Sequence, residues 1–224
     1  MTAPPDNSHA FLDAQRQRWE SIFSAKPAVF GDRPSAPALA AADLCAREGA
    51  KTILELGAGQ GRDSMYFARR GFSVTALEYS KTGVETILKK ARSLGLLERI
   101  AALCHDVREP LPFQDQSFDA CYSHMLYCMA LETYELERLS SEVRRILKPN
   151  GLQVYTVRTT EDPQFGTGTP RGENLYEIAG GFIVRFFDEE TVRSLAKGYE
   201  LVSLDRFDEG SLPRKLFRVT LRRQ

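Results

Sequence analysis

The chain has 224 residues, of which 42% are hydrophobic and 27% are charged, as in an ordinary globular protein. Its 30 basic and 30 acidic residues cancel, so no overall field attracts the chain to nucleic acid. No apolar stretch approaches the roughly 20 residues that a membrane span needs, which argues against a membrane protein.

The features of an exported or a zinc-binding protein are also missing from the sequence. Residues 1–9 do not combine basic residues with a following apolar run, and the four cysteines form no CxxC pair. No cluster of His, Asp and Glu suggests a metal ligand set. We therefore expect a cytoplasmic protein with reduced thiols and no bound metal.

The first 35 residues predict a helical extension ahead of the main domain. Between residues 9 and 24, large apolar side chains that include Trp19 and Phe23 recur at spacings of three and four. We interpret residues 1–35 as an extension or lid and residues 36–224 as the main domain. Trp19 and Phe23 are candidates for the wall of a substrate pocket, and plain packing is the alternative.

From residue 36 onward, helical and strand-like segments alternate along the chain. Helical patterns cover residues 36–48, 61–70, 81–94 and 132–147, the last followed by a turn at 148–151, and strand-like runs cover residues 52–56, 72–77, 100–104, 118–122 and 152–157. This alternation predicts a parallel sheet that is covered by helices on both faces.

The C-terminal third has a different pattern. Residues 158–171 are rich in Thr, Gly, Pro and charge, which predicts a mobile loop. Asp188 is placed to cap a helix that continues to Lys197. Residues 199–207 and 215–221 predict two closing strands.

A glycine-rich turn joins the first expected strand to the next expected helix. The segment Glu55-Leu-Gly-Ala-Gly-Gln-Gly61 places glycines at three alternate positions, where they permit positive φ and a close approach of ligand to backbone. Arg62 stands where the dinucleotide pattern GxGxxG needs its third glycine, and the sequence lacks the GK[ST] of a P-loop. The turn therefore favours a nucleoside ligand without a diphosphate.

Acidic residues stand at the ends of three successive expected strands, namely Glu55, Glu78 and Asp106. Glu78 follows the glycine turn by about 20 residues, the interval at which an acid meets ribose hydroxyls. Any one of these acids alone would more often be a solvated residue at a strand end. Together with the glycine turn they favour S-adenosylmethionine (SAM), which carries an ammonium, a sulfonium and a ribose but no phosphate.

These motifs resemble those of class I SAM-dependent methyltransferases over about residues 52–157. The resemblance rests on Glu55–Gly61, Glu78, Asp106 and Phe118-Asp-Ala-Cys-Tyr-Ser123. The run Gly-Gln-Gly-Arg-Asp-Ser is similar to that of small-molecule members such as the tellurite-resistance and thiopurine-type branches. The family implies a Rossmann-like α/β fold, a seven-stranded, mostly parallel sheet with helices on both faces and an antiparallel last strand. It also implies cofactor contacts from Glu55, Gly57, Ala58, Gly59, Gly61, Glu78, Tyr79, Asp106, Val107 and Ser123.

The residues that would meet a methyl acceptor are less clearly marked. His124 follows the fourth expected strand and is the candidate general base, with Tyr127 close by; a hydrogen-bonded wall histidine is the alternative. Arg158, Arg171 and Tyr176 follow the fifth strand, where arginine suggests an anionic acceptor and a solvated loop is the equal alternative.

The sequence therefore predicts a SAM-dependent methyltransferase with a small-molecule acceptor and no nucleic-acid or membrane partner. The Asn/Asp-Pro-Pro-Tyr/Phe motif of enzymes that act on base amines or protein amides is absent after the fourth strand. A SAM-binding regulator without turnover and a protein or RNA methyltransferase remain as alternatives. A thiolate, selenide or tellurium oxyanion would need only positioning, whereas a hydroxyl or amine would gain from a base.

Overall fold

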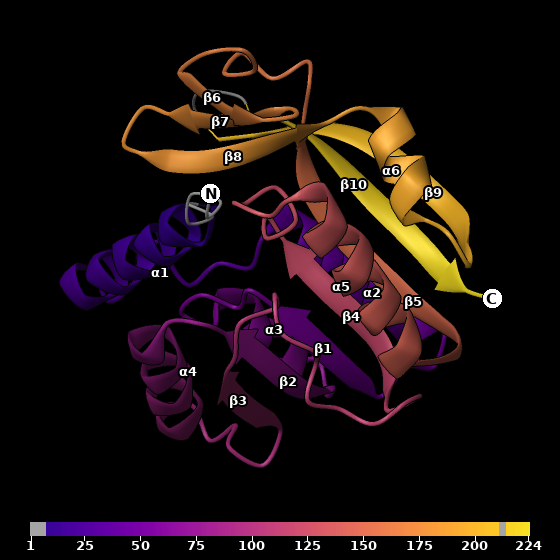
Figure 1. Ribbon diagram of the computed structural model, residues 1–224. Coiled ribbons are helices and arrows are strands. Elements are labelled where there is room, and N and C mark those ends of the chain that lie inside the picture. Colours follow the sequence, from indigo (N-terminus) through magenta and orange to yellow (C-terminus); the bar gives the residue numbers. More distant parts are fainter. Residues whose placement is uncertain (1–7, 211–213) are drawn as a thin grey trace, which may run out of the picture.

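The computed structural model describes residues 8–210 and 214–224, with side chains from residue 14 onward. A twisted sheet lies at its centre, with helices on both faces and a smaller set of antiparallel strands at one end (Figure 1). The N-terminal part contains α1 (Ser8–Ala25), α2 (Ala36–Arg47), β1 (Thr52–Leu56), α3 (Arg62–Arg69), β2 (Ser73–Glu78), α4 (Lys81–Ser93), β3 (Ile100–Cys104), β4 (Phe118–His124) and α5 (Thr133–Ile146). The C-terminal part contains β5 (Leu147–Thr159), β6 (Thr169–Gly172), β7 (Leu175–Ile178), β8 (Phe182–Phe187), α6 (Glu189–Leu195), β9 (Tyr199–Glu209) and β10 (Arg214–Arg223).

Strands β3, β2, β1, β4 and β5 lie side by side in that order and run parallel. The order reverses between β1 and β4, and open α/β sheets bind ligands at such a point, beyond the carboxyl ends of the strands. β10 pairs antiparallel with β5, and β9 pairs antiparallel with β10. The parallel α/β sheet with an antiparallel last strand is therefore confirmed.

The expected number of seven strands is too low. Three further strands, β6, β7 and β8, pair antiparallel with one another, and β8 joins the end of β5 through two residue pairs. β6 and β7 have only four residues each, too few for an alternating pattern to stand out in the sequence. The turns between them contain Asn174 and the pair Gly180-Gly181 at positive φ.

Two segments that the sequence assigned to loops belong to strands. β5 continues through Arg158 and Thr159, and β6 begins at Thr169, so both ends of the expected mobile loop 158–171 lie in regular structure. The expected turn at 148–151 lies within β5 as an irregularity, with Asn150 at a φ of 63°. Arg158 pairs with Leu216 on β10 and Phe186 on β8, which are distant in sequence, so local composition did not reveal that β5 continues this far.

Asp188 caps α6 as expected, because its carboxylate accepts a hydrogen bond from the amide of Thr191 at 2.8 Å. The sheet buries apolar residues on both faces, with α2, α3 and α4 on one side and α5 and α6 on the other. In the part of the chain described, no helix combines the length and apolar character needed to cross a membrane.

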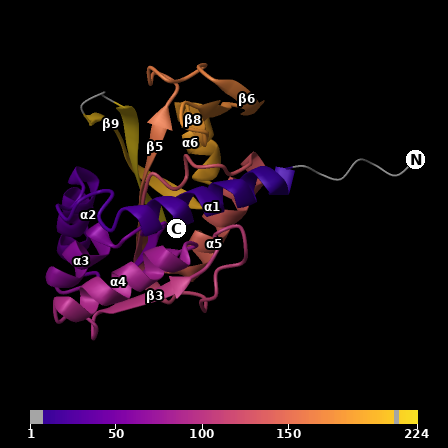
Figure 2. The same cartoon turned by 90° about the vertical axis from the view of Figure 1, so that its left-hand side faces the viewer.

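Helix α1 stands apart from these two layers and lies between α4 and the β7–β8 turn (Figures 1 and 2). At one side the Gln15 side-chain amide donates to the Gly181 carbonyl at 3.0 Å. At the other side the Glu20 carboxylate accepts from the Ser80 hydroxyl, which also caps α4, at 2.5 Å. The helix is thus held at two points, on opposite sides of the carboxyl edge of the sheet.

Candidate functional site

A cavity of about 500 Å³ lies at the carboxyl edge of the parallel strands, within the size range of small-ligand sites. Its wall is formed by α1, the segment that follows it, the ends of β1 to β4 and the facing ends of β9 and β10. Many of the residues singled out from the sequence meet here, namely Trp19, Phe23, Glu55, Gly57, Ala58, Gly59, Glu78, Tyr79, Asp106, Val107 and His124.

The first two glycines of the turn place bare backbone against this cavity. Gly57 and Gly59 have φ values of 69° and 57°. A Cβ on Gly59 would lie 3.6 Å from the Phe23 ring and 3.7 Å from the Phe30 ring, at ordinary van der Waals distance. The space beside Gly59 is therefore cavity space that is bordered by the aromatic residues of the N-terminal segment.

The third glycine, Gly61, is placed differently and does not line the cavity. Its φ is 80°, and a Cβ there would lie 2.8 Å from Cγ1 of Ile87 in α4. Gly61 therefore permits the close packing of the turn on α4, a role that the alternating pattern alone could not separate from ligand contact.

Glu78, at the end of β2, is held by the backbone on both sides. One carboxylate oxygen accepts from the Gly59 amide at 2.8 Å and the other from the Ser80 amide at 3.0 Å. Burial raises the pKa of Glu78 to about 7, although these hydrogen bonds act to lower it. Each oxygen keeps a further lone pair, so the carboxylate can still accept from ribose hydroxyls.

Glu55, at the end of β1, is 3% exposed and accepts a hydrogen bond from the Ser64 hydroxyl. Burial, together with the nearby carboxylate of Asp63, raises the pKa of Glu55 above its ordinary value. A cation in the cavity would favour the ionised form of this carboxyl. The site is therefore suited to a ligand that carries a positive group.

Asp106, after β3, is already paired with Arg108. The Arg108 Nη2 lies 2.6 Å from one carboxylate oxygen, and its Nε lies 3.0 Å from the other. Burial acts to raise the pKa of Asp106, but the hydrogen bonds from Arg108 outweigh it and the pKa is lowered. An adenine amine would thus share this carboxylate with Arg108. The neighbouring His105, which the sequence interpretation left aside, also lines the cavity, and its buried Nε2 has no partner among the described residues.

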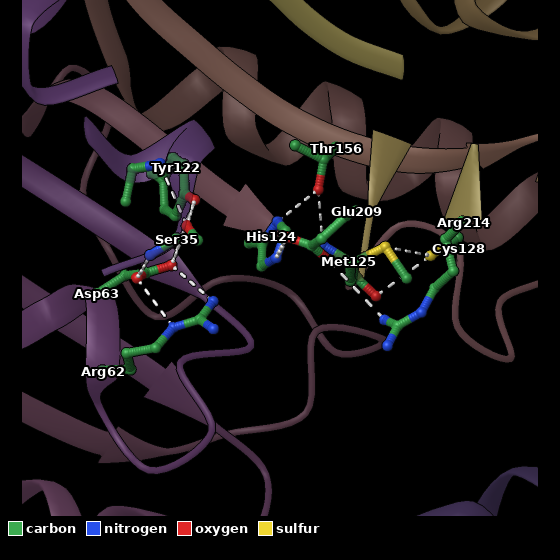
Figure 3. Close-up of polar contacts among 11 residues, drawn as sticks. Ser35, Arg62, Asp63, Tyr122, His124, Met125, Cys128, Thr156, Glu209 and Arg214 are labelled. Atoms are coloured by element: carbon green, nitrogen blue, oxygen red, sulfur yellow. Dashed lines mark hydrogen bonds and ion pairs between the residues drawn. The ribbon is translucent and has the colours of Figure 1, made fainter. Parts of the chain in front are cut away.

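The opposite end of the cavity contains a chain of polar contacts around His124 (Figure 3). The imidazole Nδ1 lies 2.8 Å from the Thr156 hydroxyl, and Nε2 lies 3.2 Å from a carboxylate oxygen of Glu209. Arg214 lies 3.8 Å from the other oxygen of Glu209. Glu209 and Arg214 both line the cavity, and the sequence interpretation missed them because they lie on the last two strands, far from every motif.

A second polar network ties the start of α2 to the start of α3 beside the cavity (Figure 3). The Asp63 carboxylate accepts from the Ser35 amide at 2.8 Å and from the Ser35 hydroxyl at 2.7 Å. Arg62 pairs with Asp63, and the Tyr122 hydroxyl joins Ser35 at 2.9 Å. The sequence interpretation contained no role for this network, because Ser35 meets Asp63 and Tyr122 from a distant part of the chain.

Two predicted residues near His124 lie outside the cavity wall. Ser123 is 1% exposed, and its hydroxyl has no partner among the described residues. Tyr127 is fully buried, stacks on Tyr155 with ring centroids 4.6 Å apart, and accepts a hydrogen bond from Gln153 at 2.7 Å. The structure therefore places the Tyr127 hydroxyl in the core, away from the cavity.

The three candidates after the fifth strand also lie outside this wall. Arg158 is buried and pairs with Asp162 at 2.5 Å, and Arg171 is exposed and pairs with Glu177. Tyr176 packs edge-on against Phe165, with ring centroids 5.6 Å apart. The arginines that line the cavity are instead Arg62, Arg108 and Arg214.

Comparison with known proteins agrees with the resemblance to methyltransferases in the part of the chain that forms the parallel strands. Residues 53–151 match a family model described as a methyltransferase domain. The chain is 35% identical to phosphoethanolamine N-methyltransferase 1 of Triticum aestivum over 104 residues, which are 45% of this chain and 20% of that protein. It is 35% identical to the glycine/sarcosine/dimethylglycine N-methyltransferase of Actinopolyspora halophila over 105 residues, 46% of this chain and 18% of that protein. The match thus spans about one fifth of the length of these relatives.

A solved structure extends the similarity of fold to the whole chain. The 1,6-didemethyltoxoflavin-N1-methyltransferase of Burkholderia thailandensis, solved with 1,6-didemethyltoxoflavin and S-adenosylhomocysteine bound, superimposes with a TM-score of 0.76. The two proteins are 20% identical, and the match covers 100% of this chain and 93% of the other. At this identity the comparison shows a common fold.

Proposed function

We propose that this chain, in which residues 53–151 form a methyltransferase domain, transfers a methyl group from SAM to a small-molecule acceptor. The observation that carries the proposal is the convergence of three acids on one cavity. Glu55, Glu78 and Asp106 stand at the carboxyl ends of three adjacent strands and line the same cavity as the bare backbone of the glycine turn. A cationic nucleoside fits this arrangement of carboxylates.

The residues present fit the groups of SAM one by one. Glu55 would face the positive methionine end beside Gly57 and Gly59, and Glu78 would accept from the ribose hydroxyls. Tyr79 and Val107 would border the adenine, with Asp106 accepting from its amine. When bound, SAM supplies a methyl group that its sulfonium already activates. The chain must then align the acceptor with that methyl group and exclude water.

The described part of the expected extension, residues 8–35, is proposed as the lid of this cavity; residues 1–7 lie outside the described residues. Trp19, Phe23 and Phe30 line it, with the Trp19 ring centroid 5.4 Å from that of Phe23 and 6.0 Å from that of Phe30. Gln60, between two glycines of the turn, accepts from the Val29 amide at 2.9 Å and donates to the Lys26 carbonyl at 2.7 Å. These hydrogen bonds fasten the end of the lid directly to the glycine turn.

The relatives support a small acceptor. Their names describe methyl transfer to phosphoethanolamine, and to glycine, sarcosine and dimethylglycine. The cavity is bordered on one side by the aromatic side chains of α1 and has about 500 Å³ in all, so cofactor and acceptor together must be compact. An acceptor of low molecular weight is consistent with both observations.

Binding of S-adenosylhomocysteine tests the cofactor assignment. Trp19 is the one tryptophan of the sequence and lines the cavity, so its fluorescence should change on titration, in parallel with the heat measured by calorimetry. Binding should also protect the peptide bonds after Arg16 and Arg18 in α1 from trypsin. Saturating ligand without any change in fluorescence, heat or cleavage would contradict the proposal.

Incubation of a cell lysate with the protein and methyl-labelled SAM then tests the acceptor class. Label in the solvent-extractable fraction supports a small acceptor. Label in the macromolecular fraction would instead indicate a protein or RNA methyltransferase. Cofactor binding without any labelled product would indicate a regulator.

A further inference from the structure

Both ring nitrogens of His124 contact polar groups of the protein, and these contacts determine which of the two nitrogens carries the proton of the neutral ring. The Thr156 hydroxyl oxygen accepts from the Met125 amide at 3.0 Å and lies 2.8 Å from the His124 Nδ1. The hydroxyl proton of Thr156 is therefore free to be donated to that Nδ1. The other ring nitrogen, Nε2, lies 3.2 Å from the Glu209 carboxylate.

The carboxylate sets the tautomer of the imidazole. An ionised carboxylate can only accept hydrogen bonds. Nε2 of His124 must therefore be protonated to donate to Glu209. Burial acts to raise the pKa of Glu209, but the hydrogen bond from His124 and the positive charges nearby outweigh it and the pKa is lowered. The unprotonated nitrogen of a neutral His124 is then Nδ1, which faces Thr156.

Beside His124, the Glu209 carboxylate can still accept a hydrogen bond from the cavity. It lines the cavity wall and keeps lone pairs beyond the one that faces His124. Arg214 lies 3.8 Å from its second oxygen, and Arg62 is a further positive group whose charge acts on it. Apolar side chains border the same space, among them Trp19, Met125 and Leu126.

We propose that Glu209, and not His124, accepts the hydrogen of the methyl acceptor, and that the reactive atom of this acceptor is an N–H nitrogen or an O–H oxygen on an apolar body. The inference rests on the proposed function and narrows its substrate class. Glu209 is the catalytic residue in this assignment, and His124 is a positioning residue that holds the carboxylate through Nε2. A thiolate or an oxyanion is disfavoured, because it has no hydrogen to donate to the Glu209 carboxylate.

Every bond, electron pair and proton in the proposed methyl transfer is accounted for by SAM, the acceptor and Glu209. The acceptor lone pair forms the new bond to the methyl carbon, and the carbon–sulfur bonding pair stays on sulfur, which becomes a neutral thioether. The proton that the acceptor nitrogen or oxygen loses passes to the Glu209 carboxylate and from there to solvent. No oxidant, reductant or further co-reactant is needed.

Nitrogen NMR of histidine-labelled protein tests the tautomer without any acceptor. The sequence has three histidines, so comparison with a His124→Asn variant assigns the His124 signals. We expect a protonated Nε2 and an unprotonated Nδ1 in the neutral ring. A protonated Nδ1 with a bare Nε2 would overturn the proposal, because His124 could then act as the base itself.

Paired binding probes test the acceptor class on the protein saturated with S-adenosylhomocysteine. Phenol donates an O–H, and benzoate is an anion of similar size. We expect Glu209→Gln to weaken phenol binding about tenfold and to leave benzoate binding equal or stronger. The matched control is Glu200→Gln, an exposed position on the same strand, and we expect it to change neither. Equal effects on both probes, or no loss of phenol binding, would overturn the proposal.

Cofactor binding separates this inference from the proposed function. Glu209→Gln should keep the S-adenosylhomocysteine affinity of the wild type, while turnover of an N–H or O–H acceptor falls by about 100-fold, within the range of general base catalysis. Loss of cofactor binding in the wild type itself would defeat the proposed function. Undiminished turnover in Glu209→Gln would defeat only the assignment of Glu209.

Discussion

The two ends of the cavity are built in different ways. At the end that we propose for the cofactor, called the cofactor end, Glu55 and Glu78 are buried at the ends of adjacent strands, and hydrogen bonds from the glycine turn and from Ser64 and Ser80 hold them. At the acceptor end, His124 on β4 meets Glu209 on β9. The first end is fixed by the sheet itself, whereas the second depends on contacts between distant segments. If the two ends bind cofactor and acceptor as we propose, a substitution at Glu209 should leave the cofactor contacts in place.

The largest expected effect on cofactor binding comes from Gly59→Val, at the end of the cavity that we propose for the cofactor. A Cβ at this position would touch the Phe23 and Phe30 rings at 3.6 and 3.7 Å, so the branches of a valine would crowd these rings and the cavity that they border. We expect S-adenosylhomocysteine affinity to fall by at least about tenfold, equivalent to about 1.4 kcal/mol. The positive φ of Gly59 should also cost about 1 to 2 kcal/mol of stability, less than the clash at Gly61, so the fold should persist. Calorimetry measures the affinity and circular dichroism the fold.

Gly61→Val is the matched variant for this prediction. Its Cβ would meet Cγ1 of Ile87 at 2.8 Å at a backbone φ of 80°, so we expect a loss of stability on the order of 3 kcal/mol. Unchanged affinity in Gly59→Val would contradict the position of the glycine turn in the ligand site. A stable Gly61→Val protein would contradict its packing role.

The next largest effect concerns the buried carboxyl of Glu55 at the same end of the cavity. The pKa of Glu55 is raised above 4.5 in the folded chain by burial and by Asp63. As pH rises, Glu55 therefore ionises in the unfolded chain before it ionises in the folded chain. The free energy of unfolding falls with pH from about pH 4.5 up to the raised pKa. Glu55→Gln has no carboxyl at this position and avoids the loss. The free energy of unfolding of the variant minus that of the wild type should therefore increase by on the order of 1 kcal/mol between about pH 5 and about pH 8.

Thermal unfolding of both proteins at the two pH values measures this difference. Glu137→Gln, on the exposed side of α5, serves as the comparison for removal of one acid. Saturating SAM should reduce the advantage of Glu55→Gln, because a bound cation stabilises the ionised wild-type carboxyl. An advantage that shrinks as pH rises would show that Glu55 is not held in its neutral form.

This contrast between the ends also explains what the sequence could and could not predict. The parallel sheet, the glycine turn and the acids at 55, 78 and 106 follow one another at short range, so spacing and composition locate them. Glu209 meets His124 only because β10 inserts between β5 and β9, a pairing that no local pattern contains. The four-residue strands β6 and β7 were missed because alternation needs a longer run to be visible.

A smaller effect is expected from Tyr127→Phe. The Tyr127 hydroxyl accepts from the Gln153 amide at 2.7 Å in the core, and its removal leaves that buried donor without this partner. We expect a loss of about 1 kcal/mol in the free energy of unfolding, with kcat unchanged within about twofold. Chemical denaturation measures the first and turnover the second. A large fall in kcat with normal stability would restore Tyr127 as a candidate catalytic residue.

The smallest effect is expected from Arg171→Ala, which tests whether the acceptor end extends to the β6–β7 hairpin. The Arg171 guanidinium pairs with Glu177 at an exposed position, and it does not line the cavity. Exposed ion pairs contribute little, so stability should change by less than about 1 kcal/mol and KM for the acceptor should stay the same. Arg214→Ala is the variant for comparison. This arginine lies beside Glu209, so its loss should raise KM for the acceptor or lower kcat. A raised KM in Arg171→Ala would instead mean that the acceptor reaches this hairpin, and that an anionic group on it meets Arg171.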